Sequence, residues 1–182
     1  MAMTSRERVL TALRRSEPDR VPYCELGVDR SLAQRLMGWG APATQASNLE
    51  VNAYTIDEAK ALAAFLGLDN LSYVLRAPVY ARKEAGQDGR LFYGEGLIKT
   101  AADLPQLELP DPHDDALYAG AEAFLRQAGD YSAWFVTRIG IFPTMLSLGT
   151  ENFCLALYDQ RAFVEAVLDR YVDWIVVVAE RV

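Results

Sequence analysis

The chain has 182 residues, of which 51% are apolar and 24% are charged, and its formal net charge is -7. This composition predicts a globular protein with enough apolar side chains for a buried core, and it excludes a disordered chain. The acidic balance also excludes an extended nucleic-acid surface, which needs a basic footprint.

The sequence carries no feature of a secreted or membrane protein. Arg6, Glu7 and Arg8 occupy the positions where a secretory signal would have an apolar segment. The longest wholly apolar run, 175–179, is too short to span a bilayer. Cys24 and Cys154 form no CxxC pair, and we expect two buried free thiols, with a disulfide between them as the alternative. We therefore predict a cytoplasmic protein without a membrane partner.

The first expected elements are a helix, a short strand and a second helix. Thr4 and Glu7 have the spacing of a capping box, and Pro18 ends the helix that they open. Residues 21–26 are predicted to form a short buried strand. Asp29 is predicted to cap the next helix, because its side chain can accept hydrogen bonds from the first free amides.

A third helix and a second strand follow. Thr55 or Asp57 opens this helix and Gly67 ends it, after which residues 71–75 are predicted to form a strand. Extended segments at 79–83 and 90–93 flank a glycine-containing turn, which predicts an antiparallel hairpin inserted at about 78–99.

The rest of the chain alternates helix and strand. Residues 116–127 are predicted to be helical and 132–136 to form the third core strand. Two helices, at 151–158 and 161–182, complete the chain. In the last helix apolar residues recur at helical spacing up to Val182 without a C-cap, so we expect this face to pack against more protein than the chain supplies.

This order of elements predicts an α/β fold. Strands separated by helices pair in parallel through right-handed crossovers. About three such strands are the proportion expected of the N-terminal portion of a (β/α)8 barrel, which takes about 250 residues. An open doubly wound sheet is the rival, but residues 26–30 lack the GxGxxG spacing. We therefore expect residues 1–182 to be an incomplete barrel domain whose C-terminal half is absent.

Several stretches carry a resemblance to a known family. Residues 5–13, followed by Glu17-Pro18-Asp19-Arg20-Val21-Pro22, resemble the start of the uroporphyrinogen decarboxylase superfamily, which includes the corrinoid-linked methyltransferases. Residues 96–100, 103–104, 109–112 and 117–118 are similar to a connection in the methyltransferase-like branch. Glu151-Asn152-Phe153 with Leu157-Tyr158-Asp159 is similar to its following helix. The resemblance spans nearly the whole chain and implies a distorted barrel with its site at the C-terminal ends of the strands.

Departures from the family pattern favour one branch. Decarboxylases of this superfamily carry an arginine-rich stretch after the first strand, whereas Glu25 and Asp29 here would repel a polycarboxylate substrate. The family's essential aspartate aligns with Arg76, and its tyrosine aligns near Leu148. The resemblance therefore implies methyl transfer from a corrinoid to a thiol in the full-length protein. Decarboxylation in porphyrin biosynthesis, a lyase reaction, is the alternative.

The methyltransferase branch implies a zinc ion, which lowers the pKa of a bound thiol. Its ligands, typically His-x-Cys and a later Cys, are expected in the second half of the barrel. His113 lies in a connection, and Cys24 and Cys154 have no ligand spacing. We therefore expect no metal site or cofactor in this chain, and zinc in the full-length parent.

Three polar residues follow the expected strands and are candidates for substrate binding: Glu25, Arg76 and Arg138. Surface salt bridges are the alternative explanation. No catalytic residue is assigned, because Ser72, Thr137 and Ser147 have no nearby His or acid partner that would support a hydrolase triad.

Two functional classes remain. The first is an N-terminal enzyme fragment that is inactive alone and whose parent acts on a small molecule or a corrinoid protein. The second is a noncatalytic subunit or binding module that associates with itself through its exposed apolar edge.

Overall fold

The computed structural model describes residues 2–40, 54–86 and 91–182 and divides into two compact units. Unit 1 comprises Met1–Leu75 and Ala119–Val136, and unit 2 comprises Arg76–Tyr118 and Thr137–Val182. The chain therefore passes from one unit to the other three times, after Leu75, Tyr118 and Val136.

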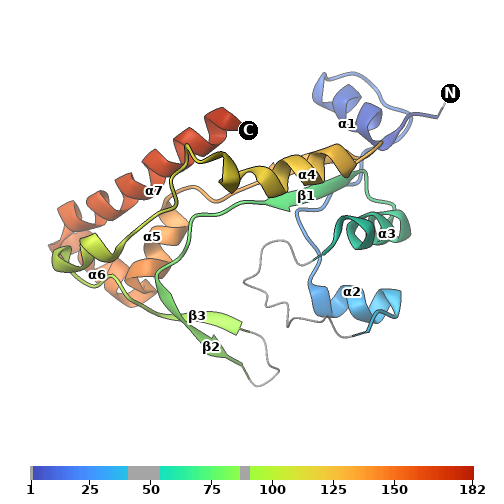
Figure 1. Ribbon diagram of the computed structural model, residues 1–182. Coiled ribbons are helices and arrows are strands. Elements are labelled where there is room, and N and C mark those ends of the chain that lie inside the picture. The colour runs from blue at the N-terminus through green and yellow to red at the C-terminus, as the bar shows by residue number, and fades with distance from the viewer. Residues whose placement is uncertain (1, 41–53, 87–90) are drawn as a thin grey trace. The chain divides into compact units, whose positions relative to one another are not determined.

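Unit 1 contains four helices in its described part (Figure 1): α1 (Ser5–Leu13), α2 (Arg30–Met37), α3 (Ile56–Leu66) and α4 (Ala119–Gln127). Thr4 opens α1 with the expected capping box, and Thr55 opens α3 with another. Asp29 caps α2 by accepting from two backbone amides. Gly67 ends α3 in the left-handed conformation at φ 71°, which glycine adopts without steric cost.

The sheet of unit 1 consists of two parallel strands. β1 (Asn70–Val74) pairs with β4 (Ser132–Val136) in a register that aligns Asn70 with Ser132 and Val74 with Val136. Helix α3 contacts β1, and α1 contacts β4. The core beneath them contains Ala63, Leu68, Leu71 and Ala128. The sequence predicted both strands, and the mixed α/β character is confirmed.

The predicted buried strand at 21–26 is wrong, so the expectation of three parallel strands is also wrong for the described residues. Val21 is 83% exposed and Leu26 is 62% exposed. This segment lies beside the start of β1, where the Asp69 N–H donates to the Tyr23 carbonyl at 2.7 Å. The backbone N–H and carbonyl of Glu25 then form hydrogen bonds with the side-chain amide of Asn70 and not with a backbone group. The segment therefore does not form a ladder of backbone hydrogen bonds with β1.

Unit 2 contains the predicted hairpin. β2 (Ala81–Ala85) and β3 (Leu91–Gly96) pair antiparallel, and the intervening turn at 87–90 lies outside the described residues. A Cβ at Gly96 would collide with backbone atoms of Leu148 and Gly149, so the hairpin packs backbone to backbone against the end of a helix. Two short 3-10 helices follow, η1 (Ala101–Gln106) and η2 (Asp115–Leu117). The helix expected over 116–127 is therefore divided between η2 and α4.

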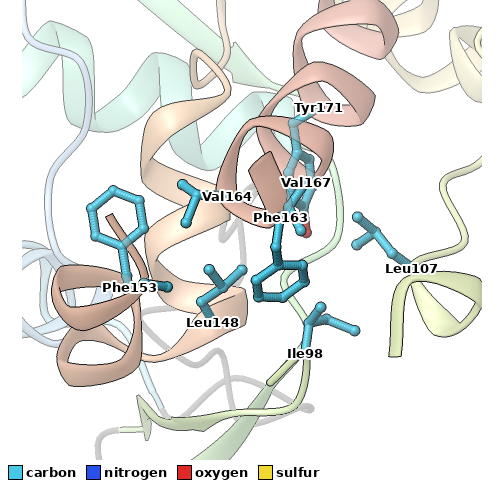
Figure 2. Close-up of a cluster of buried hydrophobic side chains, with 9 residues drawn as sticks. Ile98, Leu107, Leu148, Phe153, Phe163, Val164, Val167 and Tyr171 are labelled. Atoms are coloured by element: carbon cyan, nitrogen blue, oxygen red, sulfur yellow. The ribbon is translucent and has the colours of Figure 1, made fainter. Parts of the chain in front are cut away.

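Three helices complete unit 2: α5 (Ile141–Leu148), α6 (Thr150–Asp159) and α7 (Arg161–Arg181). They pack against one another, and α5 also contacts β3. Figure 2 shows their apolar side chains converging with Ile98 and Leu107 on one core. The buried face of α7 includes Val164, Val167 and Tyr171, as the helical spacing predicted.

Among the helices of the described ranges, none is both long and apolar enough to cross a membrane.

Candidate functional site

The ends of β1 and β4 bring two arginines together. The parallel register ends with Val74 opposite Val136, and the Leu75 N–H donates to the Val136 carbonyl at 3.1 Å. Arg76 and Arg138 each follow two residues after the last aligned pair. The two arginines therefore follow paired parallel strands at corresponding positions, and both belong to unit 2. We call Arg76 and Arg138 the arginine pair.

Arg76 is half-buried, and its Nε is buried without a hydrogen-bond partner in the described part of the chain. Burial lowers the pKa of its guanidinium below the usual value, and the positive charge of Arg138 lowers it further. Arg76 forms no salt bridge among the described residues.

Arg138 is also half-buried and has no carboxylate partner within residues 2–40, 54–86 and 91–182. Its guanidinium carbon lies 4.4 Å from the centre of the Phe142 ring, a cation–π contact that holds the planar group. Burial lowers the pKa of Arg138 as well. The arginine pair thus places two half-buried positive charges after neighbouring strands with no compensating carboxylate in the part of the chain that is described.

Two hydroxyl-bearing residues belong to the same region, and the sequence did not single them out for substrate binding. Thr137 precedes Arg138, and its Oγ1 is buried without a partner in the described residues. Tyr93, a half-buried residue of β3, is near enough to affect the pKa of both arginines. The Thr-Arg sequence directly after β4 could have indicated Thr137. Only the packing of the hairpin in three dimensions reveals Tyr93.

A hydrogen-bonded network of hydroxyls fixes the segment that follows Arg76. The Tyr171 hydroxyl donates to the Pro78 carbonyl at 3.0 Å and lies 2.8 Å from Ser147 Oγ. The same Ser147 oxygen accepts from the Tyr80 N–H at 3.0 Å. Burial raises the pKa of Tyr171 to about 12, so this hydroxyl stays protonated at neutral pH. Helices α5 and α7 therefore hold residues 78–80 in place.

Glu25 belongs to unit 1, whereas both members of the arginine pair belong to unit 2. Its backbone N–H donates to Asn70 Oδ1 at 2.9 Å, and its carbonyl accepts from Asn70 Nδ2 at 2.8 Å. Its side chain is exposed. The structure thus brings two of the three predicted substrate-binding residues together, and the role of Glu25 stays a prediction.

The described residues do not fit a zinc ion. No group of three or more His, Cys, Asp or Glu side chains within 2–40, 54–86 and 91–182 could hold a metal. Cys24 is partly buried in unit 1, and Cys154 is exposed on α6 in unit 2. His113 lies in the connection before η2, where its N–H donates to the Asp111 carboxylate at 2.9 Å.

A cavity of about 320 Å³ lies between the last three helices, α5, α6 and α7. Its lining is mostly apolar and consists of Ile141, Thr144, Phe153, Leu157, Arg161, Val164, Glu165 and Leu168. Arg161 and Glu165 pair with each other at 2.8 Å, so the charges of this cavity are satisfied internally. The cavity lacks the unpaired polar atoms that characterise the arginine pair.

Comparison with known proteins identifies the fold. No family model matches the sequence, and no curated protein matches it. The structure is similar to that of a methyltransferase from Methanosarcina mazei, with a TM-score of 0.61 and 16% sequence identity. The match covers 94% of this chain and 53% of the methyltransferase, so the chain spans about half the length of that protein. The chain therefore has a methyltransferase-like fold.

Proposed function

We propose that this chain forms part of a methyltransferase with a (β/α)8 barrel, and that the arginine pair binds its substrate. The observation that carries the proposal is the structural similarity to a methyltransferase over 94% of the chain. The position of the arginine pair agrees with it, because enzymes built on such barrels place their chemistry at the C-terminal ends of the strands. Arg76 follows β1 and Arg138 follows β4.

The proposed reaction is methyl transfer from a corrinoid to a thiol, as the resemblance to the corrinoid-linked methyltransferases implies. Zinc is expected in the whole enzyme, where it would make the thiol a better nucleophile. Since the described residues offer no zinc site, its ligands would have to come from elsewhere, and no step assigned to this chain involves a metal.

The role assigned to this chain is to bind and orient the substrate. Arg76 and Arg138 present several N–H donors on a rigid planar group, which fixes both the position and the direction of whatever they bind. Phe142 restricts the orientation of Arg138, and the Tyr171 network restricts the backbone after Arg76. Holding a substrate in one reactive geometry lowers the activation free energy of the reaction.

The test uses the complete reading frame in which these residues occur. The purified product is given methylcobalamin and a panel of thiols, and methyl transfer is followed by the change in cobalamin absorbance and by mass spectrometry of the thiol. We expect Arg76→Gln and Arg138→Gln to raise KM by about tenfold or more, since each removes a charged hydrogen-bonding group. Arg126→Gln is the control, because Arg126 is exposed and pairs only with Glu122 among the described residues.

Three results would contradict the proposal. The first is decarboxylation of a porphyrinogen without methyl transfer, which would favour the other branch of the superfamily. The second is the absence of methyl transfer with every thiol, which would favour a noncatalytic subunit. The third is methyl transfer that neither arginine substitution affects more than Arg126→Gln does.

A further inference from the structure

Two buried polar atoms in unit 2 lack a hydrogen-bond partner in the described residues: Nε of Arg76 and Oγ1 of Thr137. A buried donor without a partner costs free energy, and nearly all buried polar groups in folded proteins are paired. Thr137 comes directly after β4 and Arg76 comes two residues after the end of β1, and these two strands are paired in register. The two unpaired atoms therefore occur at one edge, which calls for a common explanation.

The positive charges at this edge are also uncompensated. Elsewhere a buried or half-buried arginine has a carboxylate, as Arg30 has Glu58 at 2.7 Å. Arg76 and Arg138 lack one in the described ranges, and each guanidinium is half-buried, so a negative partner from outside these residues would be favourable. Two adjacent arginines without an acid are a suitable site for an anion that is not part of these residues.

We propose that Arg76, Arg138, Thr137 and Tyr93 form a binding site for the oxyanion group of a small molecule, that is, a carboxylate, a sulfonate or a phosphate. This inference rests on the proposed function, since it names the substrate group that the arginine pair would hold. All four residues belong to unit 2. The guanidinium groups supply charge and paired N–H donors, and the two hydroxyls supply additional donors.

Each residue has a distinct role in this site. Arg76 Nε–H and Thr137 Oγ–H are donors with no other acceptor in the described part of the chain, so an oxyanion would satisfy both. Arg138 is held over Phe142 and presents its remaining N–H groups. Tyr93, a half-buried residue of the hairpin strand β3, is near enough to influence both guanidinium groups electrostatically, and its hydroxyl would be the fourth donor. The inserted hairpin thereby contributes one wall of the site.

The experiment measures binding of simple anions to the 182-residue chain. Inorganic phosphate, methanesulfonate and acetate are titrated separately by calorimetry against chloride at equal ionic strength, and thermal unfolding is recorded in parallel. We expect at least one of the three to bind saturably and to raise the unfolding temperature, as any ligand of the folded state does. The anion that binds most tightly identifies the class of substrate group.

Substitutions then locate the binding site. We expect Arg76→Gln and Arg138→Gln each to weaken binding about tenfold or more, which corresponds to about 1.4 kcal/mol. Arg138→Lys keeps the charge but loses the planar fork, so it should lie between the wild type and Arg138→Gln. Thr137→Val should weaken binding about threefold, because it removes a neutral donor. Arg82→Gln is the matched control, since Arg82 is exposed on the hairpin and pairs with Glu95.

The inference is overturned if none of the three anions binds more tightly than chloride, or if Arg82→Gln weakens binding as much as Arg76→Gln. Circular dichroism of each variant establishes that it is folded. The outcome is independent of turnover, because binding to the chain requires no methyl donor. Methyl transfer by an enzyme that binds no anion at this site would overturn the inference but would leave methyl transfer as the proposed reaction. Anion binding at this site without any methyl transfer would support the inference and contradict the proposed reaction.

Discussion

Two groups of arginines, one in each unit, differ in whether they have acidic partners. In unit 1, Asp69 is completely buried and accepts hydrogen bonds from Arg8 at 2.6 Å and from Arg20 at 2.7 Å. Arg8 also donates to Asp19 at 2.6 Å, and the Tyr23 N–H donates to Asp69 at 2.9 Å. We call these residues the Asp69 cluster. In unit 2, the arginine pair has no acid at all in the described residues.

This difference separates a structural role from a binding role. Every charged group of the Asp69 cluster has a partner, and the cluster joins α1 and the segment at 19–23 to the residue before β1. A complete network of this kind stabilises the arrangement of its own elements and leaves nothing to attract a ligand. The arginine pair is incomplete, and its unpaired donors are available to a molecule from outside.

The largest expected effect is the loss of the central acid in unit 1. Asp69→Asn removes the charge that compensates Arg8 and Arg20, and breaking a buried ion pair from one side costs about 3–5 kcal/mol. We expect urea denaturation to show a loss of this size. Glu165→Gln breaks the exposed pair with Arg161 and should leave stability unchanged. Equal effects of the two substitutions would show that the Asp69 cluster contributes no more to the free energy of unfolding than an exposed ion pair does.

Acid should weaken the same cluster. Burial alone would raise the pKa of Asp69, but the hydrogen bonds from the Tyr23 N–H, Arg8 and Arg20 outweigh it and lower the pKa. A lowered folded-state pKa contributes stability that is fully present above the unfolded value of about 4 and is lost as the pH falls through the folded value. We expect the free energy of unfolding to fall below about pH 4. A free energy that stays constant there would contradict the account.

Two hydroxyl groups in unit 2 allow the same comparison between paired and unpaired polar groups, with smaller expected changes in the free energy of unfolding. Tyr171 has two partners, so Tyr171→Phe should lower the free energy of unfolding by about 1–2 kcal/mol. Thr137 Oγ1 has none in the described ranges, so Thr137→Val, which keeps the shape, should be neutral or stabilising. Denaturation of both variants without added anion checks the difference. A Thr137→Val variant that loses as much stability as Tyr171→Phe would show that its hydroxyl is paired.

The last expected effect is a small gain in stability, in contrast to the losses expected for Asp69→Asn and Tyr171→Phe. Arg76→Met removes a half-buried charge that Arg138 repels, so it should raise stability without added anion by about 0.5–1 kcal/mol. Arg20→Met, which removes a partner of Asp69, should lower it. The two variants are compared by thermal unfolding in chloride. A stability loss in Arg76→Met would indicate that Arg76 has a structural partner.

The sequence predicted the elements whose rules are local. The caps at Thr4 and Asp29, the end of the third helix at Gly67 and the strand at 132–136 follow from residue type and spacing and were confirmed, and of the two candidate starts of the third helix the structure has Thr55. The strand at 21–26 failed because its pairing depends on Asn70, far away in sequence, whose side chain replaces a backbone partner. Apolar composition indicated burial, but the register of hydrogen bonds decides whether a strand forms.

The candidate site was predictable in part for a related reason. Arg76 and Arg138 follow predicted strands that pair in parallel, so their corresponding positions could be inferred from the sequence, whereas their role in substrate binding stays a prediction. Tyr93 comes from an inserted hairpin whose packing against α5 is set by the close approach at Gly96. That contact is long-range, and no spacing in the sequence indicates it.

The most direct test of the central claim observes the arginine Nε–H groups by heteronuclear NMR while the tightest-binding anion is added. We predict a saturable shift of the Arg76 Nε–H resonance, because that donor is buried and has no partner in the described residues. The Arg8 Nε–H resonance should not move, because it donates to Asp19. Equal shifts at both arginines, or a shift at Arg8 alone, would contradict the distinction between a structural and a ligand-binding arginine.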